Sequence, residues 1–271
     1  MNDRDKKPRR RPAAEGSDEA TLVEGRNAVS ELLKSGRTVD KLFVAEGAHG
    51  RMGGVIALAK AAGVPVIRCD RRKLDGMSRT GNHQGVIAQA AAHEYAALDD
   101  LFAAAEAKGE APLFVVCDGI EDPHNLGAIL RSAEAAGAHG VIIPKRRAAG
   151  LTAVVARASA GAIEHILVHK ATNLAAALDE LKARGVWVYG AEADGTVDLY
   201  KAGFAGATAL VIGSEGSGVS RLVREKCDFI VSIPMRGRVN SLNASNAAAV
   251  LLYEAVRRRI DGKGEQTWMI N

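Results

Sequence analysis

Two polar residues stand out in the segment 121–140, which reads EDPHNLGAILRSAEAAGAHG: Asn125 and Arg131. The apolar runs on either side predict a strand before this segment and a strand after it, with a helix between them. Helical side chains lean toward the helix amino terminus, so we expect Arg131 to extend over Gly127 and Ala128. It would then reach the helix mouth, where anions are favoured and a guanidinium suits a phosphate. Alternatively, Asn125 is a helix N-cap and Arg131 is a solvated side chain.

Two later segments also place polar residues where a strand gives way to a helix. In ALVIGSEGSGVS, the glycines allow tight turns and close backbone approach, whereas Glu215 would repel a phosphate. A ligand with hydroxyl or amino groups, or a cationic one, fits this loop better. In SIPMRGRVNSLNASN, Arg236 and Arg238 precede Ser241 and Asn243. One of these polar residues is enough to cap a helix, so the others are available for a ligand.

Several common enzyme signatures are missing. The chain has no G-x-G-x-x-G fingerprint after its strands, which argues against a nucleotide-dependent oxidoreductase, and no H-E-x-x-H, P-loop or G-x-S-x-G. Its three cysteines (Cys69, Cys117 and Cys227) are far apart and form no C-x-x-C pair. The sequence therefore predicts neither a disulfide framework nor a bound metal.

The net charge of +4 is concentrated at the amino terminus of the 271-residue chain. Residues 1–14 hold six Lys or Arg and two Asp, and the remaining residues balance at thirty basic and thirty acidic. We expect residues 1–18 to form a disordered arm that either grips RNA or solubilises the protein. No apolar run reaches the length of a membrane span and no signal segment begins the chain, so we expect a cytoplasmic protein without a membrane partner.

Alternating apolar and helical segments predict an α/β protein with two domains. A small unit covers residues 20–92, a connector 93–111, a larger unit 112–262 and a tail 263–271. In the larger unit, nearly continuous Val and Ile runs are typical of a parallel sheet covered on both faces. Ligands of such sheets bind beyond the carboxyl ends of the strands, which directs attention to the three loops after Ile120, Ile212 and Ile233.

Together, DPHNLGAILRSAEAAG, LVIGSEGSGVS and IPMRGRVNSLNASNAAAVLLYE resemble the three motifs of the SpoU (TrmH-type) RNA ribose 2'-O-methyltransferases, in their order and spacing. VEGRNAVSELL and GNHQGVIA are similar to the L30e-like RNA substrate-binding domain of this family. The two-domain form is most similar to the RlmB-type 23S rRNA guanosine methyltransferases. The resemblance implies a deep trefoil knot in the larger domain (the SPOUT fold), a homodimer, and S-adenosylmethionine as cofactor.

The resemblance also assigns residues. It implies a catalytic set consisting of Asn125, Arg131, Glu215, Ser241 and Asn243. It implies cofactor contacts from Gly213, Ile233 and Leu242, to which we add Ser214, Gly216 and Met235. For RNA contacts we expect Arg236 and Arg238 beside the third motif, and Arg68 and Arg72 in the small domain. The run from Lys145 to Arg147 is a further basic cluster, either solvated or in contact with RNA.

The implied reaction is attack by a ribose 2'-oxygen of a guanosine in 23S rRNA on a sulfonium methyl group. The site must align the reacting atoms and stabilise a developing alkoxide. The guanidinium of an arginine is normally protonated, so Arg131 either holds a phosphate and stabilises the alkoxide while phosphate or water takes the proton, or is transiently neutral in a dry pocket and acts as a base. The alternatives to this substrate are tRNA or another rRNA site, and the alternative to an enzyme is a non-catalytic RNA-binding factor in ribosome assembly.

Overall fold

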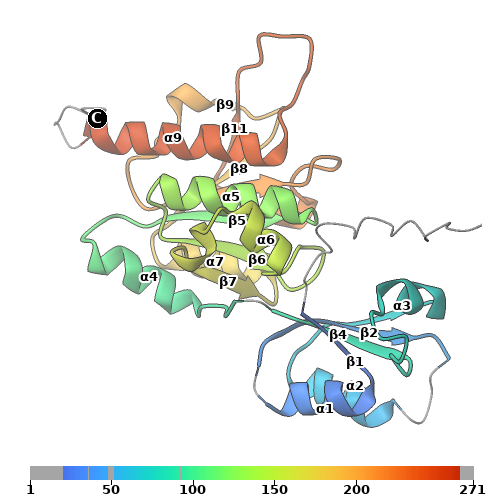
Figure 1. The fold of residues 1–271 in the computed structure, drawn as a ribbon. Helices are drawn as coiled ribbons and strands as arrows, with labels where there is room; N and C mark the ends of the chain where they lie inside the picture. Colours follow the sequence, from blue (N-terminus) through green and yellow to red (C-terminus); the bar gives the residue numbers. More distant parts are fainter. Residues whose placement is uncertain (1–20, 36, 48–51, 92, 263–271) are drawn as a thin grey trace, which may run out of the picture.

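The computed structural model describes residues 21–35, 37–47, 52–91 and 93–262. The predicted basic arm (1–18) and tail (263–271) lie outside the described residues. Two separate sheets, of four and seven strands, form the centres of two domains (Figure 1). No helix in the described part of the chain is long and apolar enough to cross a membrane.

The small domain is a four-stranded sheet in the order β1-β4-β2-β3. Strand β4 is antiparallel to β1 and β2, and β3 is parallel to β2. Leu42 and Val44 pack beneath α1 and α2, whereas the alternate residues Phe43 and Ala45 pack with α3. The elements are β1 (Thr21–Glu24), α1 (Arg26–Lys34), β2 (Val39–Ala45), α2 (Gly53–Ala61), β3 (Val66–Cys69), α3 (Arg71–Met77) and β4 (Val86–Ala90). The predicted alternation is confirmed, and β1 is an additional strand that the pattern did not single out.

The larger domain is a seven-stranded sheet in the order β7-β6-β5-β10-β8-β11-β9, and all its pairings are parallel. The strands are β5 (Leu113–Asp118), β6 (Gly140–Pro144), β7 (Val168–Ala171), β8 (Trp187–Ala191), β9 (Val197–Asp198), β10 (Thr208–Gly213) and β11 (Phe229–Ser232). The helices are α4 (Leu98–Ala107), α5 (Pro123–Ala135), α6 (Ala153–Ala158), α7 (Leu174–Ala183), α8 (Arg221–Arg224) and α9 (Ala244–Gly262), with 3-10 turns η1 (Ala162–Glu164) and η2 (Leu199–Lys201).

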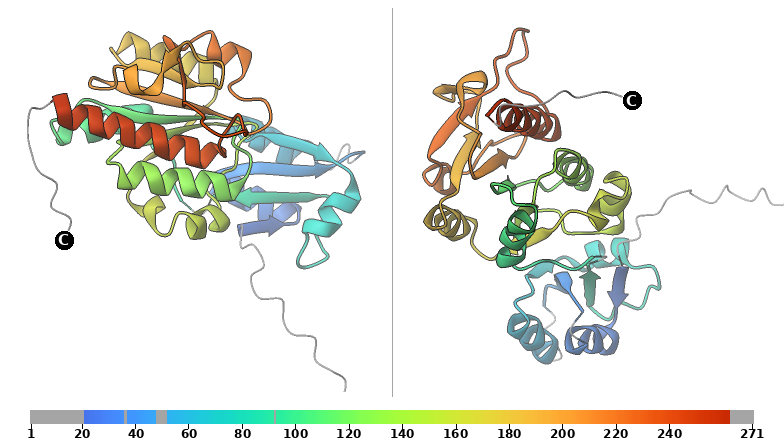
Figure 2. Two further views of the ribbon diagram at one scale, coloured as in Figure 1. Left: turned by 90° about the horizontal axis from the view of Figure 1, so that it is seen from above. Right: turned by 90° about the vertical axis from the view of Figure 1, so that its left-hand side faces the viewer.

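Helices cover both faces of this sheet (Figure 2). Along β5, Val115 and Cys117 belong to a core shared with α5, α6 and α9, whereas Phe114 and Val116 belong to a core shared with α4, α7 and α8. Because both sets of alternate residues are buried, every residue of the strand interior must be apolar. The predicted parallel sheet with two covered faces is confirmed.

A buried polar cluster ties the small domain to the larger one. The Tyr95 hydroxyl donates to Asp40 Oδ1 at 2.5 Å and accepts from the Leu151 N–H at 2.9 Å, and Lys170 Nζ lies 2.5 Å from the same carboxylate. Burial and the neighbouring carboxylate raise the pKa of Tyr95, so its hydroxyl stays protonated and donates. A Cβ at Gly150 would lie 2.3 Å from Asp40 Oδ2, so the two domains approach closely here.

Candidate active site

Helix α5 begins one turn before the position that the sequence suggested. The side chain of Asp122 accepts a hydrogen bond from the His124 N–H at 2.9 Å and caps the helix, and Pro123 occupies its first position. The expectation that Asn125 is the N-cap is therefore wrong. Asn125 lies within the first turn, where it is only 9% exposed, and its amide is free to contact other loops.

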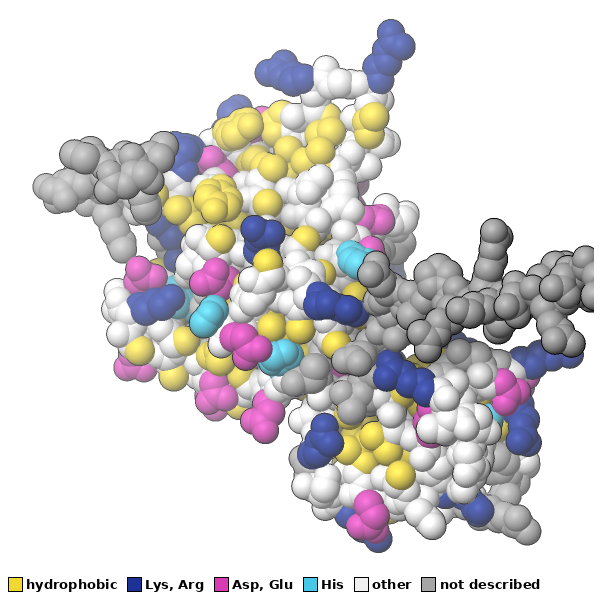
Figure 3. All heavy atoms as spheres, in the orientation of Figure 1, with side chains coloured by type: hydrophobic (Ala, Val, Ile, Leu, Met, Phe, Trp, Pro, Cys, Tyr) yellow, Lys and Arg dark blue, Asp and Glu magenta, His cyan; other side chains and the backbone are white. Residues whose placement is uncertain are grey.

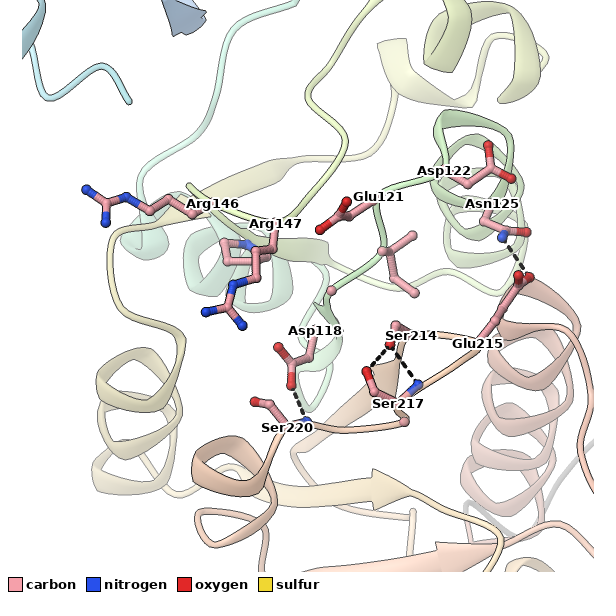
Figure 4. Close-up of a pocket in the computed structure, with 14 residues that line it drawn as sticks. Asp118, Glu121, Asp122, Asn125, Arg146, Arg147, Ser214, Glu215, Ser217 and Ser220 are labelled. Carbon is pink, nitrogen blue, oxygen red and sulfur yellow. Dashed lines mark hydrogen bonds between the residues drawn. The ribbon is translucent and has the colours of Figure 1, made fainter. Parts of the chain in front are cut away.

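Three side chains from three different loops meet at this point. Asn125 Nδ2 donates to Glu215 Oε1 at 2.8 Å (Figure 4). Asn243 Nδ2 donates to Asn125 Oδ1 at 3.0 Å and also to Glu215 Oε1. Two amides are thus oriented on one carboxylate, and we call these three residues the polar triad. Hydrogen bonds to a charged group are among the stronger ones, so the triad fixes the relative positions of the loops.

Asn243 has a second role at the opposite end of its amide. Its Oδ1 accepts from the Ser245 N–H at 2.9 Å and from the Asn246 N–H at 3.3 Å, which caps α9. Capping and ligand positioning were alternative interpretations of this residue. In the structure this one side chain does both, because Asn243 Oδ1 caps the helix while Asn243 Nδ2 donates within the triad.

The glycine-rich loop after β10 folds back tightly on itself. A Cβ at Gly213 would lie 2.1 Å from the carbonyl carbon of Gly218. Gly218 has φ +63°, and a Cβ there would lie 2.7 Å from Glu192 Oε1. The Val219 N–H donates to Glu192 at 2.6 Å, and the Ser220 N–H donates to Asp118 at 2.7 Å. Two carboxylates therefore hold the far side of the loop.

A cavity on one side of this loop has mostly apolar walls, and we call it the cofactor cavity. The predicted cofactor contacts that line it are Gly213, Ser214, Ile233, Met235 and Leu242, joined by Ser241 and Glu215 from the predicted catalytic set. Gly216 does not line it and is exposed. Ile212 and Val231 complete the apolar wall, and Glu192 and Asn240 add polar groups.

On the other side of the loop lies a second cavity of about 480 Å³, which we call the acceptor cavity. Its polar lining comprises Asp118, Glu121, Asp122, Asn125, Arg146, Arg147, Ser214, Glu215, Ser217 and Ser220. In Figure 4, Arg147 is directed toward the side that carries Asp118, whereas Arg146 points away. Ser214, Glu215 and Gly218 line both cavities, so Glu215 stands at their boundary.

Arg131 is placed differently from the expectation. It is exposed on α5 and lines neither cavity. The route over Gly127 is closed, because α6 packs there so tightly that a Cβ at Gly127 would lie 2.4 Å from Ala158 Cβ. The expectation that Arg131 extends over Gly127 to its own helix mouth is therefore wrong.

The four arginines expected to contact RNA are all exposed. Arg236 and Arg238 lie in the loop between β11 and α9, which projects from the larger domain (Figure 1), and they line neither cavity. Arg68 and Arg72 lie on β3 and α3 of the small domain. The structure thus brings together Asn125, Glu215 and Asn243 beside the cofactor cavity, whereas none of the four arginines lines either cavity.

Sequence reasoning missed Asp118 and Glu192, the two carboxylates that hold the glycine-rich loop. Asp118 ends β5, and Glu192 directly follows β8. Both stand at the carboxyl ends of parallel strands, where ligand-site residues are expected, so the strand-end rule applied to every strand would have found them.

The cofactor cavity fits S-adenosylmethionine, which carries a cationic sulfur, an apolar methyl, a flat base and hydroxyl groups. The apolar wall suits the base and the methyl, and the Glu192 and Glu215 carboxylates complement the positive charge. No group of three or more His, Cys, Asp or Glu within the described residues is arranged to hold a metal ion.

Comparison with known proteins also indicates a methyltransferase that uses S-adenosylmethionine. The SpoU rRNA methylase family model matches residues 112–253, and the model of RNA 2'-O ribose methyltransferase substrate-binding domains matches residues 22–96. YacO of Bacillus subtilis, named as a TrmH family tRNA/rRNA methyltransferase, is 55% identical over 244 residues, which are 90% of this chain and 98% of YacO. A protein of the same designation from Staphylococcus haemolyticus is 47% identical over 242 residues, covering 89% of this chain and 97% of that protein.

Solved structures agree with this result. The SpoU methyltransferase AviRb from Streptomyces viridochromogenes in complex with AdoMet is 30% identical, with a TM-score of 0.58 over 89% of this chain and 91% of AviRb. The AdoMet-bound rRNA methyltransferase from Sinorhizobium meliloti is 26% identical, with a TM-score of 0.53 over 87% of this chain and 86% of that one. Fold and site together are those of an RNA methyltransferase with S-adenosylmethionine as the expected cofactor. The chain belongs to the SpoU (TrmH) family of tRNA/rRNA methyltransferases.

Proposed function

We propose that this protein transfers a methyl group from S-adenosylmethionine to the ribose 2'-hydroxyl of a guanosine in 23S rRNA. The observation that carries the proposal is the polar triad, which fixes Glu215 at the boundary between the cofactor cavity and the acceptor cavity. A methyl group can pass between two ligands only where their sites meet, and Glu215 lines both. In the reaction, the 2'-oxygen forms a bond to the methyl carbon, and the bond from that carbon to sulfur breaks with its electron pair left on sulfur, which becomes a neutral thioether. The proton of the 2'-hydroxyl passes to an RNA phosphate or to water.

S-adenosylmethionine supplies a methyl group that is already electrophilic because it is attached to a cationic sulfur. The protein therefore has to orient the ribose and stabilise the developing charge on oxygen. In the proposal, Asn125 and Asn243 hold the Glu215 carboxylate in place. Glu215 in turn accepts a hydrogen bond from the ribose, and Ser241 contacts the cofactor side of the boundary. All four side chains thus align the reacting atoms.

Arg131 completes the site from a second copy of the chain. In its own chain it is exposed, and among the described residues no hydrogen bond or ion pair engages it. A homodimer that seats Arg131 beside the partner's acceptor cavity gives it a phosphate to bind and a developing alkoxide to stabilise. Exposed apolar side chains on and beside α9, namely Tyr200, Val250 and Tyr253, support such a dimer.

The carboxylates of the acceptor cavity support guanosine as the acceptor. Glu121 and Asp122 line the cavity and are exposed, and carboxylates repel phosphates. Asp122 already accepts from the His124 N–H, whereas Glu121 has no hydrogen-bond or ion-pair partner among the described residues and can accept from a ligand. Guanine carries two neighbouring donors, N1–H and the 2-amino group, which a carboxylate can accept together, whereas adenine, cytosine and uracil offer no such pair.

Three finer statements of the proposal concern fold, substrate and location. The order of the strands, in which β10 enters between β5 and β8 and β11 between β8 and β9, supports a trefoil knot in the larger domain. The match of residues 22–96 to an RNA substrate-binding domain supports rRNA as the substrate, recognised through the small domain. The protein then acts in the cytoplasm, where ribosomal RNA is processed.

The experiment that tests the proposal offers unmodified 23S rRNA, 16S rRNA and tRNA to the protein with labelled S-adenosylmethionine, followed by digestion to nucleosides. We expect label in 2'-O-methylguanosine from 23S rRNA alone. Label in tRNA or 16S rRNA would contradict 23S rRNA as the substrate. Label in another nucleoside would contradict guanosine as the methylated nucleoside. Binding of RNA without any transfer would favour a non-catalytic assembly factor.

A further inference from the structure

A third hollow, of about 330 Å³, lies between the two domains. Its walls come from the small domain on one side and from the connector and the ends of β6 and β7 on the other. We call it the interdomain cleft. No aspartate or glutamate is among the described residues that line it. Lysine and arginine side chains are visible on both domains near this boundary (Figure 3).

The cleft carries a local excess of positive charge. Lys170 is paired with Asp40 and is neutralised. Arg37 and Lys145 remain, and neither side chain has a hydrogen-bond or ion-pair partner in the described part of the chain. Lys145 belongs to the larger domain, yet its Nζ lies 3.3 Å from the position of a Cβ at Gly63 of the small domain. Both domains therefore contribute to one cationic site.

The remaining walls suit a nucleotide. Pro65, Val39 and Leu33 form an apolar wall on the small-domain side, against which a base or a ribose can pack. His169 donates its Nδ1–H to the carbonyl of Ala96 at 3.0 Å, which leaves its Nε2 available to a ligand. The backbone at the carboxyl end of α2, near Gly63, carries a partial negative charge, so the attraction of the cleft for anions comes from the two free cations.

The cleft and the acceptor cavity are linked along the chain by one short segment, residues 144–147. Pro144, Arg146 and Arg147 line the acceptor cavity, whereas Lys145 between them lines the interdomain cleft. Residues 145 and 147 are at most ~7 Å apart along the chain. The cationic segment after β6 thus contributes basic side chains to both the acceptor cavity and the interdomain cleft.

We propose that the interdomain cleft binds the backbone of the RNA segment adjoining the methylated nucleotide. Lys145 and Arg37 contact its phosphates, and the apolar wall contacts the neighbouring base or ribose. The inference rests on the proposed function, because it names the path that the substrate of that reaction follows from the small domain to the acceptor cavity. It also gives the connector a role, since the connector holds the two walls of the cleft together.

The test is the salt dependence of RNA binding by the full-length protein. Each lost phosphate contact on a single strand lowers the slope of log K against log salt concentration by about 0.7. For the Arg37→Gln/Lys145→Gln double variant we therefore expect a slope smaller by about 1.4 with a mixed-sequence single-stranded oligoribonucleotide. KM for a 23S rRNA transcript should rise, while kcat at saturating RNA and the affinity for S-adenosylmethionine stay unchanged.

Two further variants sharpen the result. Lys145→Arg keeps the charge and should keep the slope. Lys108→Gln removes an exposed lysine at the end of α4, on the side where β5 begins, and should also leave the slope unchanged. A double variant with the wild-type slope would overturn the proposal that the cleft binds RNA, even if the wild-type protein methylates rRNA. Conversely, the double variant could have a reduced slope although the wild-type protein methylates no RNA. That result would support RNA binding in the cleft and overturn the proposed reaction.

Discussion

Asn125 and Glu215 are 90 residues apart in the sequence, and the side-chain amide of the first donates a 2.8 Å hydrogen bond to the carboxylate of the second. Asn125 is nearly buried in the first turn of α5, whereas Glu215 is exposed at the tip of the loop after β10. The bond therefore fixes the Glu215 carboxylate, which also accepts from Asn243, to a rigid helix. It also determines where the two cavities meet, because Glu215 lines both.

Removal of this hydrogen bond should impair the methyl-transfer step more than cofactor binding. For Asn125→Ala we expect kcat to fall by about 10²-fold or more, since a fixed donor near the reacting atoms is lost, with little change in the Kd of S-adenosylmethionine. Single-turnover transfer and calorimetry measure the two quantities. His124→Ala is the matched control, because His124 is the exposed neighbour of Asn125 and lines neither cavity. Equal kcat values in both variants would remove Asn125 from the site.

The sequence predicts the sheet and the triad for different physical reasons. Continuous apolar runs report burial on both faces, so the parallel sheet follows from composition along each strand. The three loops follow from the rule that ligands bind at the carboxyl ends of strands. The position of the Arg131 side chain does not follow, because it depends on how closely α6 approaches Gly127, which no local pattern encodes. The N-cap of α5 was misplaced because Asp122 and Pro123 together form a stronger helix start than Asn125.

A mixed dimer tests whether Arg131 acts on the partner's site. Arg131→Ala and Asn125→Ala homodimers should each be inactive. In a heterodimer that carries one change in each chain, a shared site leaves one of the two sites complete, so we expect about half of the wild-type kcat per dimer. Co-expression with two different affinity tags isolates the heterodimer. No recovery of activity would place both residues in a site formed by one chain, and a monomer in sedimentation would exclude the shared site altogether.

The glycine-rich loop provides a matched pair of substitutions. Gly213→Ala places a Cβ 2.1 Å from the backbone of Gly218, so the loop must open and the cofactor cavity must change shape. We expect at least a tenfold weaker Kd for S-adenosylmethionine, measured by calorimetry. Gly216→Ala meets nothing within 4 Å and should bind S-adenosylmethionine like the wild-type protein. The opposite order of the two Kd values would mean that the cofactor binds against Gly216 rather than in the cavity behind Gly213.

The stability of the small domain should depend on pH through the carboxylate of Glu24. Burial alone would raise the pKa of this carboxylate, but the hydroxyls of Ser78 and Thr80 and the backbone N–H groups of residues 79 and 80 donate to it and lower its pKa from 4.5 to about 2. Because the pKa is lower in the folded state, the stabilisation is complete above pH 4.5 and is lost as the pH falls toward about 2.

The Glu24→Gln variant should therefore be less stable than the wild-type protein near neutral pH, and the difference should shrink between pH 4.5 and 2. Amide hydrogen exchange of β1 and β4 as a function of pH measures the opening of this domain. Glu31→Gln is the control, because Glu31 forms an exposed pair with Lys34 on α1 and such pairs contribute little. If the Glu24→Gln and wild-type profiles run parallel down to pH 2, the hydrogen bonds to Glu24 do not stabilise the turn at 78–81.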